Sequence, residues 1–291
     1  MNAIAETELI LTKEKKIYHL NLSKDEIADD IILVGDPARV EIISSKFDKI
    51  KYKIQNREFI THTGILNNKK ISVISTGIGT DNIDIVINEL DALVNIDFDT
   101  RKPNTKKRSL NLIRLGTSGA LQNDIKIDSF IVSSHGLGLD NLAHFYCHEK
   151  ILEKKMSNAF AKHTKWPNEL SSPYIVKASA KLLSLFPEFK KGITATAPGF
   201  YGPQGRTIRI KPSINDLNNK ISSFKFGQHY VTNFEMETSA LYFLGKSLGH
   251  DAITICAIIG NRSTESYSMD YRKPILKLID LILEKICPNS N

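Results

Sequence analysis

The sequence predicts a single-domain α/β protein with three layers, in which helices cover both faces of a central mixed β-sheet. Three observations lead to this prediction. Short apolar runs of strand length alternate along the chain with amphipathic runs of helical length. The 291 residues are enough to bury one large core. Because we find neither an internal repeat nor a Gly/Ser-rich linker, we expect one domain over residues 1–291.

The strands are predicted from apolar runs that end at turn residues. They are Ile31–Val34, Asn111–Gly116, Ser129–Ser134, Gly192–Pro198 and Ala252–Gly260. Two further runs flank the dipeptide Asn67-Asn68, which suits the left-handed backbone of a tight turn. This pattern predicts a β-hairpin made of Glu58–Leu66 and Lys69–Thr76.

The helices are predicted from apolar residues at helical spacing. They are Gly35–Phe47, Asp81–Val94, Tyr174–Phe186, Glu235–His250 and Lys273–Ile286. Pro37 suits a first helical turn, Asp81 can cap a helix start, and Gly249 suits a helix end. Pro187 should end the third of these helices, and the fourth is expected to be amphipathic.

The composition excludes several classes of protein. Apolar residues make up 41% and charged residues 24%, which is typical of a folded protein and not of a disordered one. The three cysteines, Cys147, Cys256 and Cys287, show no close pairing, which argues against a disulfide framework or a zinc site. We find no signal peptide and no run of about 20 apolar residues. We therefore expect a cytoplasmic protein without membrane contact.

The net charge of +7 raises the question of an anionic partner. The most basic segment, RKPNTKKR at residues 101–108, contains Pro and Asn and no aromatic residue. It is expected to be a solvated loop, so nucleic acid is not the predicted partner. A non-catalytic RNA-binding or signalling role for this loop is the alternative from another functional class.

Three predicted strand ends combine glycine with basic or hydroxyl side chains. VGDPAR spans Val34–Arg39, STGIGTDN spans Ser75–Asn82, and RLGTSGA spans Arg114–Ala120. Glycine lets the backbone approach a ligand, and the free N–H groups of a helix start attract anions, as arginine does. Neither the P-loop pattern nor G-x-G-x-x-G is present. Together the turns predict a phosphate cradle that includes Arg39 and Arg114.

These stretches, with several others, resemble the nucleoside phosphorylase family and its uridine phosphorylase branch. The segments that carry the resemblance are Tyr18–Leu22, Val34–Val40, Arg57–Phe59, Ser75–Gly79, Arg114–Gln122, Phe200–Arg206, Asn233–Thr238 and Ile258–Arg262. They occur in the order and at the approximate spacing of that family. The resemblance covers most of the chain, and it implies the family's three-layer fold.

The resemblance also implies a role for each residue of a site. Phosphate would be held by Gly35, Arg39, Arg114 and Thr117, and by Arg57 of the neighbouring subunit. Ribose would be surrounded by Glu235, Met236 and Glu237, and by His19 of the neighbouring subunit. The base would be covered by Phe200 and read by Gln204, Arg206 and Arg262. A monovalent cation, K⁺, would lie between subunits near Glu58, Ile78 and Asn82, although Asn82 replaces an expected serine.

The implied activity is phosphate-dependent cleavage of uridine to uracil and ribose 1-phosphate, a step of pyrimidine salvage. Inorganic phosphate is the co-substrate, and no organic cofactor is expected. Because His19 and Arg57 are expected to act in trans, the smallest competent unit is a homodimer. The family suggests a hexamer made of three dimers.

The chemistry of the base-reading residues favours uracil. The amide of Gln204 offers a donor and an acceptor for O2 and N3–H, and a nearby guanidinium would stabilise negative charge at O4. Purine-specific relatives tend to place an aspartate after the late buried strand, whereas here no carboxylate follows before Glu265. A purine nucleoside phosphorylase and a hydrolytic nucleosidase of the same fold stay as alternatives. The sequence leaves open whether the sugar is ribose or deoxyribose and whether thymidine is accepted.

Overall fold

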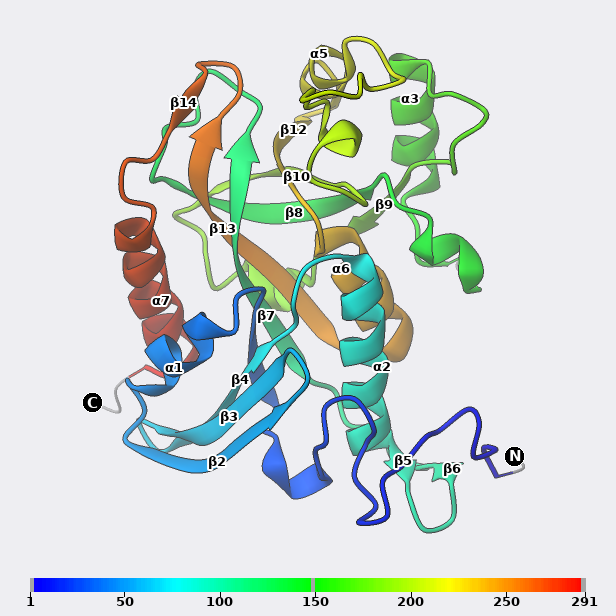
Figure 1. Ribbon diagram of the computed structural model, residues 1–291, viewed down its shortest axis with the longest axis vertical. Coiled ribbons are helices and arrows are strands. Elements are labelled where there is room, and N and C mark those ends of the chain that lie inside the picture. The colour runs from blue at the N-terminus through cyan, green and yellow to red at the C-terminus, as the bar shows by residue number, and fades with distance from the viewer. Residues whose placement is uncertain (1–2, 148–149, 289–291) are drawn as a thin grey trace.

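The computed structural model describes residues 3–147 and 150–288 and is dominated by one large sheet (Figure 1). Its 12 strands follow the order β11-β12-β10-β8-β13-β7-β1-β4-β3-β2, with β9 attached to β8 and β14 attached to β13. The strands are β1 (Asp30–Val34), β2 (Lys49–Asn56), β3 (Phe59–Leu66), β4 (Lys69–Ser75), β7 (Asn111–Ala120), β8 (Phe130–Gly138), β9 (Tyr174–Lys177), β10 (Lys190–Thr196), β11 (Lys225–Phe226), β12 (His229–Glu235), β13 (Asp251–Asn261) and β14 (Ser266–Tyr267). A separate pair consists of β5 (Ile96–Asp97) and β6 (Lys102–Pro103).

The sheet is mixed, as predicted. β1 runs parallel to β4 and β7, β13 runs parallel to β7, and β10 runs parallel to β8 and β12. The β2–β3–β4 ribbon is antiparallel, and so are the pairings of β13 with β8 and of β12 with β7. Asn67 and Asn68 have φ of 50° and 63° between β3 and β4, which confirms the predicted hairpin.

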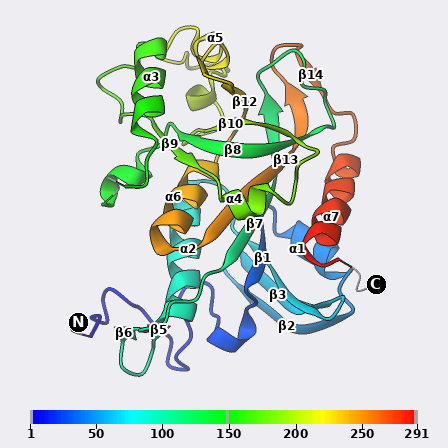
Figure 2. The same ribbon diagram turned by 180° about the vertical axis from the view of Figure 1, so that it is seen from behind.

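Helices cover both faces of the sheet, which confirms the predicted layers. They are α1 (Ala38–Ser44), α2 (Thr80–Asn95), α3 (Lys154–Thr164), α4 (Ala180–Leu183), α5 (Leu217–Ser222), α6 (Thr238–Leu248) and α7 (Arg272–Ile286). α1 and α7 lie on one side, and α2 packs beside α6 on the other, as the view from behind also shows (Figure 2). No helix in the described part of the chain is long and apolar enough to cross a membrane.

The helix predicted over Glu235–His250 begins later and is not amphipathic. Its first residues belong to β12, and α6 starts at Thr238. Every residue from Thr238 to Gly245 is buried because α2 covers one side of the helix and the sheet covers the other. Gly249, with φ of 81°, ends the helix as predicted.

Two further local predictions were wrong. Tyr174–Phe186 is not a helix: Tyr174–Lys177 forms β9 and pairs antiparallel with β8, and only the four-residue α4 follows, capped by the Ser179 side chain. The segment begins with aromatic and β-branched residues, which suit a strand. A short apolar run can form either a helix or a strand, and pairing with β8 favoured the strand. Asp81 does not cap α2, because Gly79 occupies the N-cap with φ of 101°.

The basic segment 101–108 makes contacts within the chain. Arg101 donates through Nε to the carbonyl of Ile4 at 2.7 Å, and Arg108 forms an ion pair with Asp29. Two of its cations therefore tie neighbouring segments together and are not part of an open basic patch.

Candidate active site

A cavity of about 1020 Å³ lies where the last residues of β1, β7, β12 and β13 meet. In sheets of this kind, ligands bind where strands end and loops begin. The expected site residues that line the cavity are Gly35, Arg39, Glu58, Ile78, Asn82, Arg114, Thr117, Phe200, Gln204, Arg206, Glu235, Met236, Glu237 and Arg262. His19 and Arg57 are not among the described residues that line it. The fold therefore gathers into one cavity side chains from segments far apart in the sequence.

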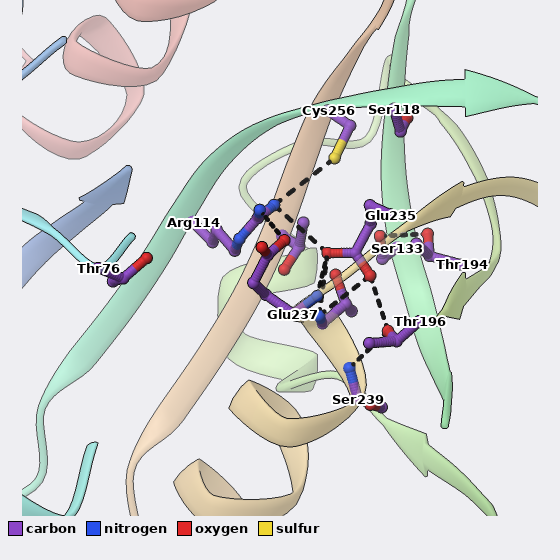
Figure 3. A network of polar contacts seen from close by, with 12 residues as sticks. Thr76, Arg114, Ser118, Ser133, Thr194, Thr196, Glu235, Glu237, Ser239 and Cys256 are labelled. Atoms are coloured by element: carbon purple, nitrogen blue, oxygen red, sulfur yellow. Dashed lines mark hydrogen bonds and ion pairs between the residues drawn. The ribbon is translucent and has the colours of Figure 1, made fainter. Parts of the chain in front are cut away.

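Arg114 lies on β7 between Leu33 of β1 and Thr254 of β13, and it is 4% exposed. Its guanidinium forms ion pairs with Glu237 and with Glu235, the latter at 3.4 Å between Nη1 and Oε2 (Figure 3). Burial lowers the pKa of Arg114, but the two carboxylates outweigh this effect and raise it above its ordinary value. A permanently charged group is thus held in the wall of the cavity.

Gly116 leaves the space that the guanidinium of Arg114 occupies. The two residues are two positions apart on β7, so their side-chain positions face the same side of the sheet. A Cβ atom on Gly116 would lie 2.1 Å from Nη1 of Arg114 and 3.0 Å from Sγ of Cys256. Burial raises the pKa of the Cys256 thiol to about 12, so this neighbour stays neutral. The glycine is therefore required for the position of Arg114.

Glu237 connects three segments of the wall. It occupies the N-cap position of α6, pairs with Arg114 of β7, and accepts a hydrogen bond from the backbone N–H of Gly79 at 2.9 Å. Burial raises the pKa of Glu237, Arg114 opposes that rise, and the nearby Glu235 adds to it. Phosphate bound beside Arg114 would compete for the guanidinium and leave this carboxylate able to accept from a ligand hydroxyl.

The Glu235 carboxylate is occupied by the start of α6. It accepts from the backbone N–H of Glu237 at 2.9 Å, from that of Thr238 at 3.0 and 3.1 Å, and from Oγ1 of Thr196 at 2.7 Å (Figure 3). Oγ1 of Thr196 in turn accepts from the N–H of Ser239 at 2.9 Å. Free N–H groups at a helix start need such partners. The geometry therefore supports a positioning role for Glu235, whereas the sequence suggested direct contact with ribose.

The first turn of α1 supplies a second arginine. Arg39 forms no ion pair with any carboxylate in the described part of the chain. Burial lowers its pKa most, Asp36 opposes this, and Arg114 lowers it further, so the two guanidinium groups repel each other across the cavity. An anion between them would relieve that repulsion.

The part of the cavity where the base was expected is built around the Gln204 side chain, which is 3% exposed. Gln204 is the last residue of the short turn Gly202–Gln204, and Gly205 follows it with φ of 71°. Oε1 of Gln204 accepts from Nη1 of Arg206 at 2.7 Å and from Nη2 of Arg262 at 3.2 Å. Two cations therefore face one neutral oxygen at the end where the base was expected.

Arg206 also stacks on the aromatic ring that was expected to cover the base. Its Cζ atom lies 3.7 Å from the ring centroid of Phe200, and Nη1 donates to the Phe200 carbonyl at 2.5 Å. One face of the ring is thus occupied, so a flat ligand can stack only on the other face or after Arg206 moves. The sequence placed both residues at this end but did not predict their contact.

His19 and Arg57 lie together outside the cavity of their own chain. Nδ1 of His19 lies 2.7 Å from Oε1 of Glu89, and the Tyr18 ring packs edge-on against the His19 ring. Nη2 of Arg57 donates to the hydroxyl of Tyr18 at 3.3 Å. This is an arrangement that residues serving a neighbouring subunit would have, and their action in trans stays a prediction.

The expected cation site offers oxygen ligands only. Glu58, Ile78 and Asn82 all line the cavity, and a Cβ on Gly77 would meet the side chains of both Asn82 and Glu58. A carboxylate, a carbonyl and an amide suit a hard cation. Within residues 3–147 and 150–288, no cluster of three His, Cys, Asp or Glu side chains could hold a metal ion.

A family model for the phosphorylase superfamily matches residues 29–272, a range that contains all the residues lining the cavity. The chain belongs to this superfamily. It is 31% identical to a uridine phosphorylase of Thermococcus kodakarensis over 261 residues, which cover 88% of this chain and 81% of the relative. It is 29% identical to a uridine phosphorylase of Haemophilus influenzae over 252 residues, covering 86% and 88% of the two chains.

The chain is also similar to proteins named purine nucleoside phosphorylases. A DeoD-type purine nucleoside phosphorylase of Clostridium perfringens is 29% identical over 273 residues, covering 91% of this chain and 97% of the relative. Among solved structures, a Trypanosoma brucei nucleoside phosphorylase described as showing uridine phosphorylase activity superposes with a TM-score of 0.85 at 30% identity, covering 95% and 98% of the chains. A uridine phosphorylase of Phytophthora capsici, at 20% identity, 97% coverage of both chains and a TM-score of 0.68, shares the fold.

Proposed function

We propose that this member of the phosphorylase superfamily cleaves uridine with inorganic phosphate to give uracil and ribose 1-phosphate. One observation carries the proposal: a single cavity contains two groups of cations that form no ion pair with a described carboxylate, Arg39 in one and Arg206 with Arg262 in the other, and Glu237 also lines it. A nucleoside phosphorylase needs both groups, because phosphate attacks one side of the sugar and the base leaves from the other.

The anion end holds the nucleophile. Arg39 and Arg114 fix the phosphate, and Gly35 and Thr117 line the same end with backbone and hydroxyl groups. Holding the attacking oxygen close to C1′ lowers the barrier by about 7 kcal/mol or more, provided that the geometry is right. Phosphate also supplies negative charge beside a sugar that becomes oxocarbenium-like.

Glu237 and Arg114 link the phosphate to the ribose. When phosphate engages Arg114, the carboxylate of Glu237 becomes available to the sugar hydroxyls, which donate to it in charge-assisted bonds. Met236 lines the same part of the cavity. Glu235 holds the start of α6, and thereby the backbone that carries the other two residues.

The base end stabilises the leaving group. As the C1′–N1 bond breaks, negative charge develops on O2 and O4 of the uracil. Arg206 and Arg262 are already turned towards this end by their shared acceptor, Gln204. Cations that are in place before the reaction stabilise the anion most effectively, because they need not reorganise as its charge develops.

The assembly and its ions extend the proposal. We propose a homodimer as the smallest competent unit, with His19 and Arg57 completing the partner's site, and a hexamer as the full assembly. K⁺ would be held by Glu58, Ile78 and Asn82 at the subunit boundary, where it would order those loops. No organic cofactor is required, and a single domain, a cytoplasmic location and a role in pyrimidine salvage stay predictions.

Ultraviolet absorbance of uridine with and without inorganic phosphate tests the activity. We expect cleavage only when phosphate is present, with ribose 1-phosphate as the sugar product. Release of uracil without phosphate would instead establish a hydrolase.

A purine nucleoside phosphorylase is the second candidate, because Glu265 lines the cavity and DeoD-type relatives reach 29% identity. A purine leaving group needs an acid to protonate it. Glu265, an exposed residue after β13, is the carboxyl group that could serve as this acid. Comparing inosine with uridine at equal concentration decides between the two. Faster cleavage of inosine would overturn the uridine proposal.

A further inference from the structure

The two cations at the base end have only neutral partners. None of the described carboxylates forms an ion pair with Arg206 or Arg262; their acceptors are the side chain and carbonyl of Gln204 and the carbonyl of Phe200. Burial lowers the pKa of Arg262 to about 10, and the nearby Arg206 adds to this. Two cations close together can stabilise an anionic leaving group. Because they repel each other, each also tends to move away unless other groups hold it in place.

One further neutral side chain holds Arg262, and it comes from a different element. Asn218 lies on α5, whose Leu217 and Ile221 are buried in a hydrophobic cluster with Phe160 and Phe224. The amide orientation that satisfies both neighbours has its oxygen accepting from Nη1 of Arg262 at 3.0 Å and its nitrogen donating to the Gln204 carbonyl at 3.2 Å. Asn218 thus bridges Arg262 and the backbone of the base-reading turn.

The same side chain also supports that turn from behind. Gly205 has φ of 71°, and a Cβ atom there would lie 3.0 Å from both amide atoms of Asn218. The backbone of the turn is therefore in close contact with the Asn218 amide. This contact is independent of the hydrogen bonds and places the amide against the residue that links Gln204 to Arg206.

Asn218 and Arg262 form a partition between two cavities. Both residues line the active-site cavity, and both also line a neighbouring polar cavity of about 500 Å³ whose walls include Lys211, Asp216 and Ser263. Without the Asn218 oxygen, Arg262 could turn into this second space, where polar groups and water would solvate its charge. The leaving base would then lose one of its two cations.

We propose that Asn218 is a positioning residue for base departure, which keeps Arg262 pressed against the Gln204 turn and facing the active-site cavity. This inference rests on the proposed uridine phosphorolysis. In this proposal Asn218 does not contact the substrate. Asn218 affects the step in which negative charge develops on the base, and it does not affect phosphate binding.

The test compares Asn218→Ala with the wild-type protein on two substrates, uridine and 5-fluorouridine. Fluorine makes the departing base a more stable anion, which depends less on protein cations. We expect kcat for uridine to fall at least about tenfold, with a smaller loss for 5-fluorouridine and an unchanged KM for phosphate. A merely structural defect would lower both kcat values by the same factor.

Asn219→Ala is the matched control, because Asn219 is the next residue of α5 and, of these two cavities, lines the second and not the active-site cavity. It should keep the wild-type ratio of the two kcat values. If Asn218→Ala does not fold, Asn218→Leu carries the test, since it keeps a branched side chain of similar size but offers no acceptor to Arg262. It too should lower kcat more for uridine than for 5-fluorouridine.

The outcomes separate the two proposals. A wild-type protein that cleaves no uridine in the presence of phosphate overturns the proposed function and this inference with it. An active wild-type protein, with equal losses on both substrates or with no loss in Asn218→Ala, overturns only the positioning role.

Discussion

Arg114 of β7 and Glu237 at the start of α6 form an ion pair in which both side chains are almost completely buried. Two such charges are costly to bury, and each is satisfied only by the other and by a few neighbours. Both residues line the cavity, Arg114 among those expected to hold phosphate and Glu237 among those expected to surround ribose.

Gly116→Ala should displace the guanidinium of Arg114. The added Cβ would lie 2.1 Å from Nη1, and Arg114 is a member of a buried pair with little room to move. We expect kcat/KM for uridine to fall about 100-fold. Wild-type activity of Gly116→Ala would show that Arg114 does not need this space.

Ionisation of Glu237 should make stability depend on pH. Burial raises its pKa above the ordinary value of 4.5, so the folded carboxyl keeps its proton where the unfolded one has lost it. The folded state then binds more protons, and the free energy of unfolding contributed by this group falls as pH rises through that window. Urea denaturation of the wild-type protein and of Glu237→Gln between pH 4.5 and about 8 measures this. Identical pH profiles would contradict the prediction.

Glu235→Ala should destabilise the protein as well as slow it. The substitution removes the acceptor for the N–H groups of Glu237 and Thr238 and for the hydroxyl of Thr196. We expect a loss of about 2 kcal/mol in the free energy of unfolding, from the lost cap and the buried groups left without partners. Glu235→Gln keeps one acceptor oxygen and should lose less. Full stability of Glu235→Ala would mean that the start of α6 is held by other groups.

Mixed dimers should reveal whether Arg57 acts in trans. Arg57→Ala and Arg39→Ala are each expected to be nearly inactive as homodimers. In a mixed dimer, one site carries both substitutions and the other carries neither, so co-expression should restore about a quarter of the wild-type activity. No recovery in separately tagged, co-purified dimers would place both residues in the site of one chain.

Gln204→Ala should weaken the discrimination between bases. The substitution removes the shared acceptor of Arg206 and Arg262 together with the amide that faces the base end. We expect uridine turnover to fall about 100-fold, whereas slow turnover of inosine changes much less. Unchanged selectivity between the two nucleosides, measured as the ratio of kcat/KM values, would refute this account of base recognition.

The sequence by itself determined the chemistry of the candidate site and most of its framework. Its motifs could be recognised because each consists of residues that are close together in the sequence, as a turn and the helix after it are. Examples are glycine at strand ends, arginine at the turns and the Gln204-x-Arg206 pair. The apolar runs of β1, β7, β8, β10 and β13 also predicted strands, whereas β2 and β12 were not predicted. Strand β9 was predicted as a helix, since a short apolar run suits both structures until a partner such as β8 is present.

Tertiary structure alone decided which charged groups meet. Arg114 and Glu237 are 123 residues apart, and they become partners because β12, which leads into α6, pairs with β7. The same holds for Thr196 against Glu235 and for Asn218 against Arg262. The physical reason is that burial and pairing are properties of the folded neighbourhood. They determine whether a carboxylate can bind a ligand, or already accepts hydrogen bonds from the protein backbone, as Glu235 does at the start of α6.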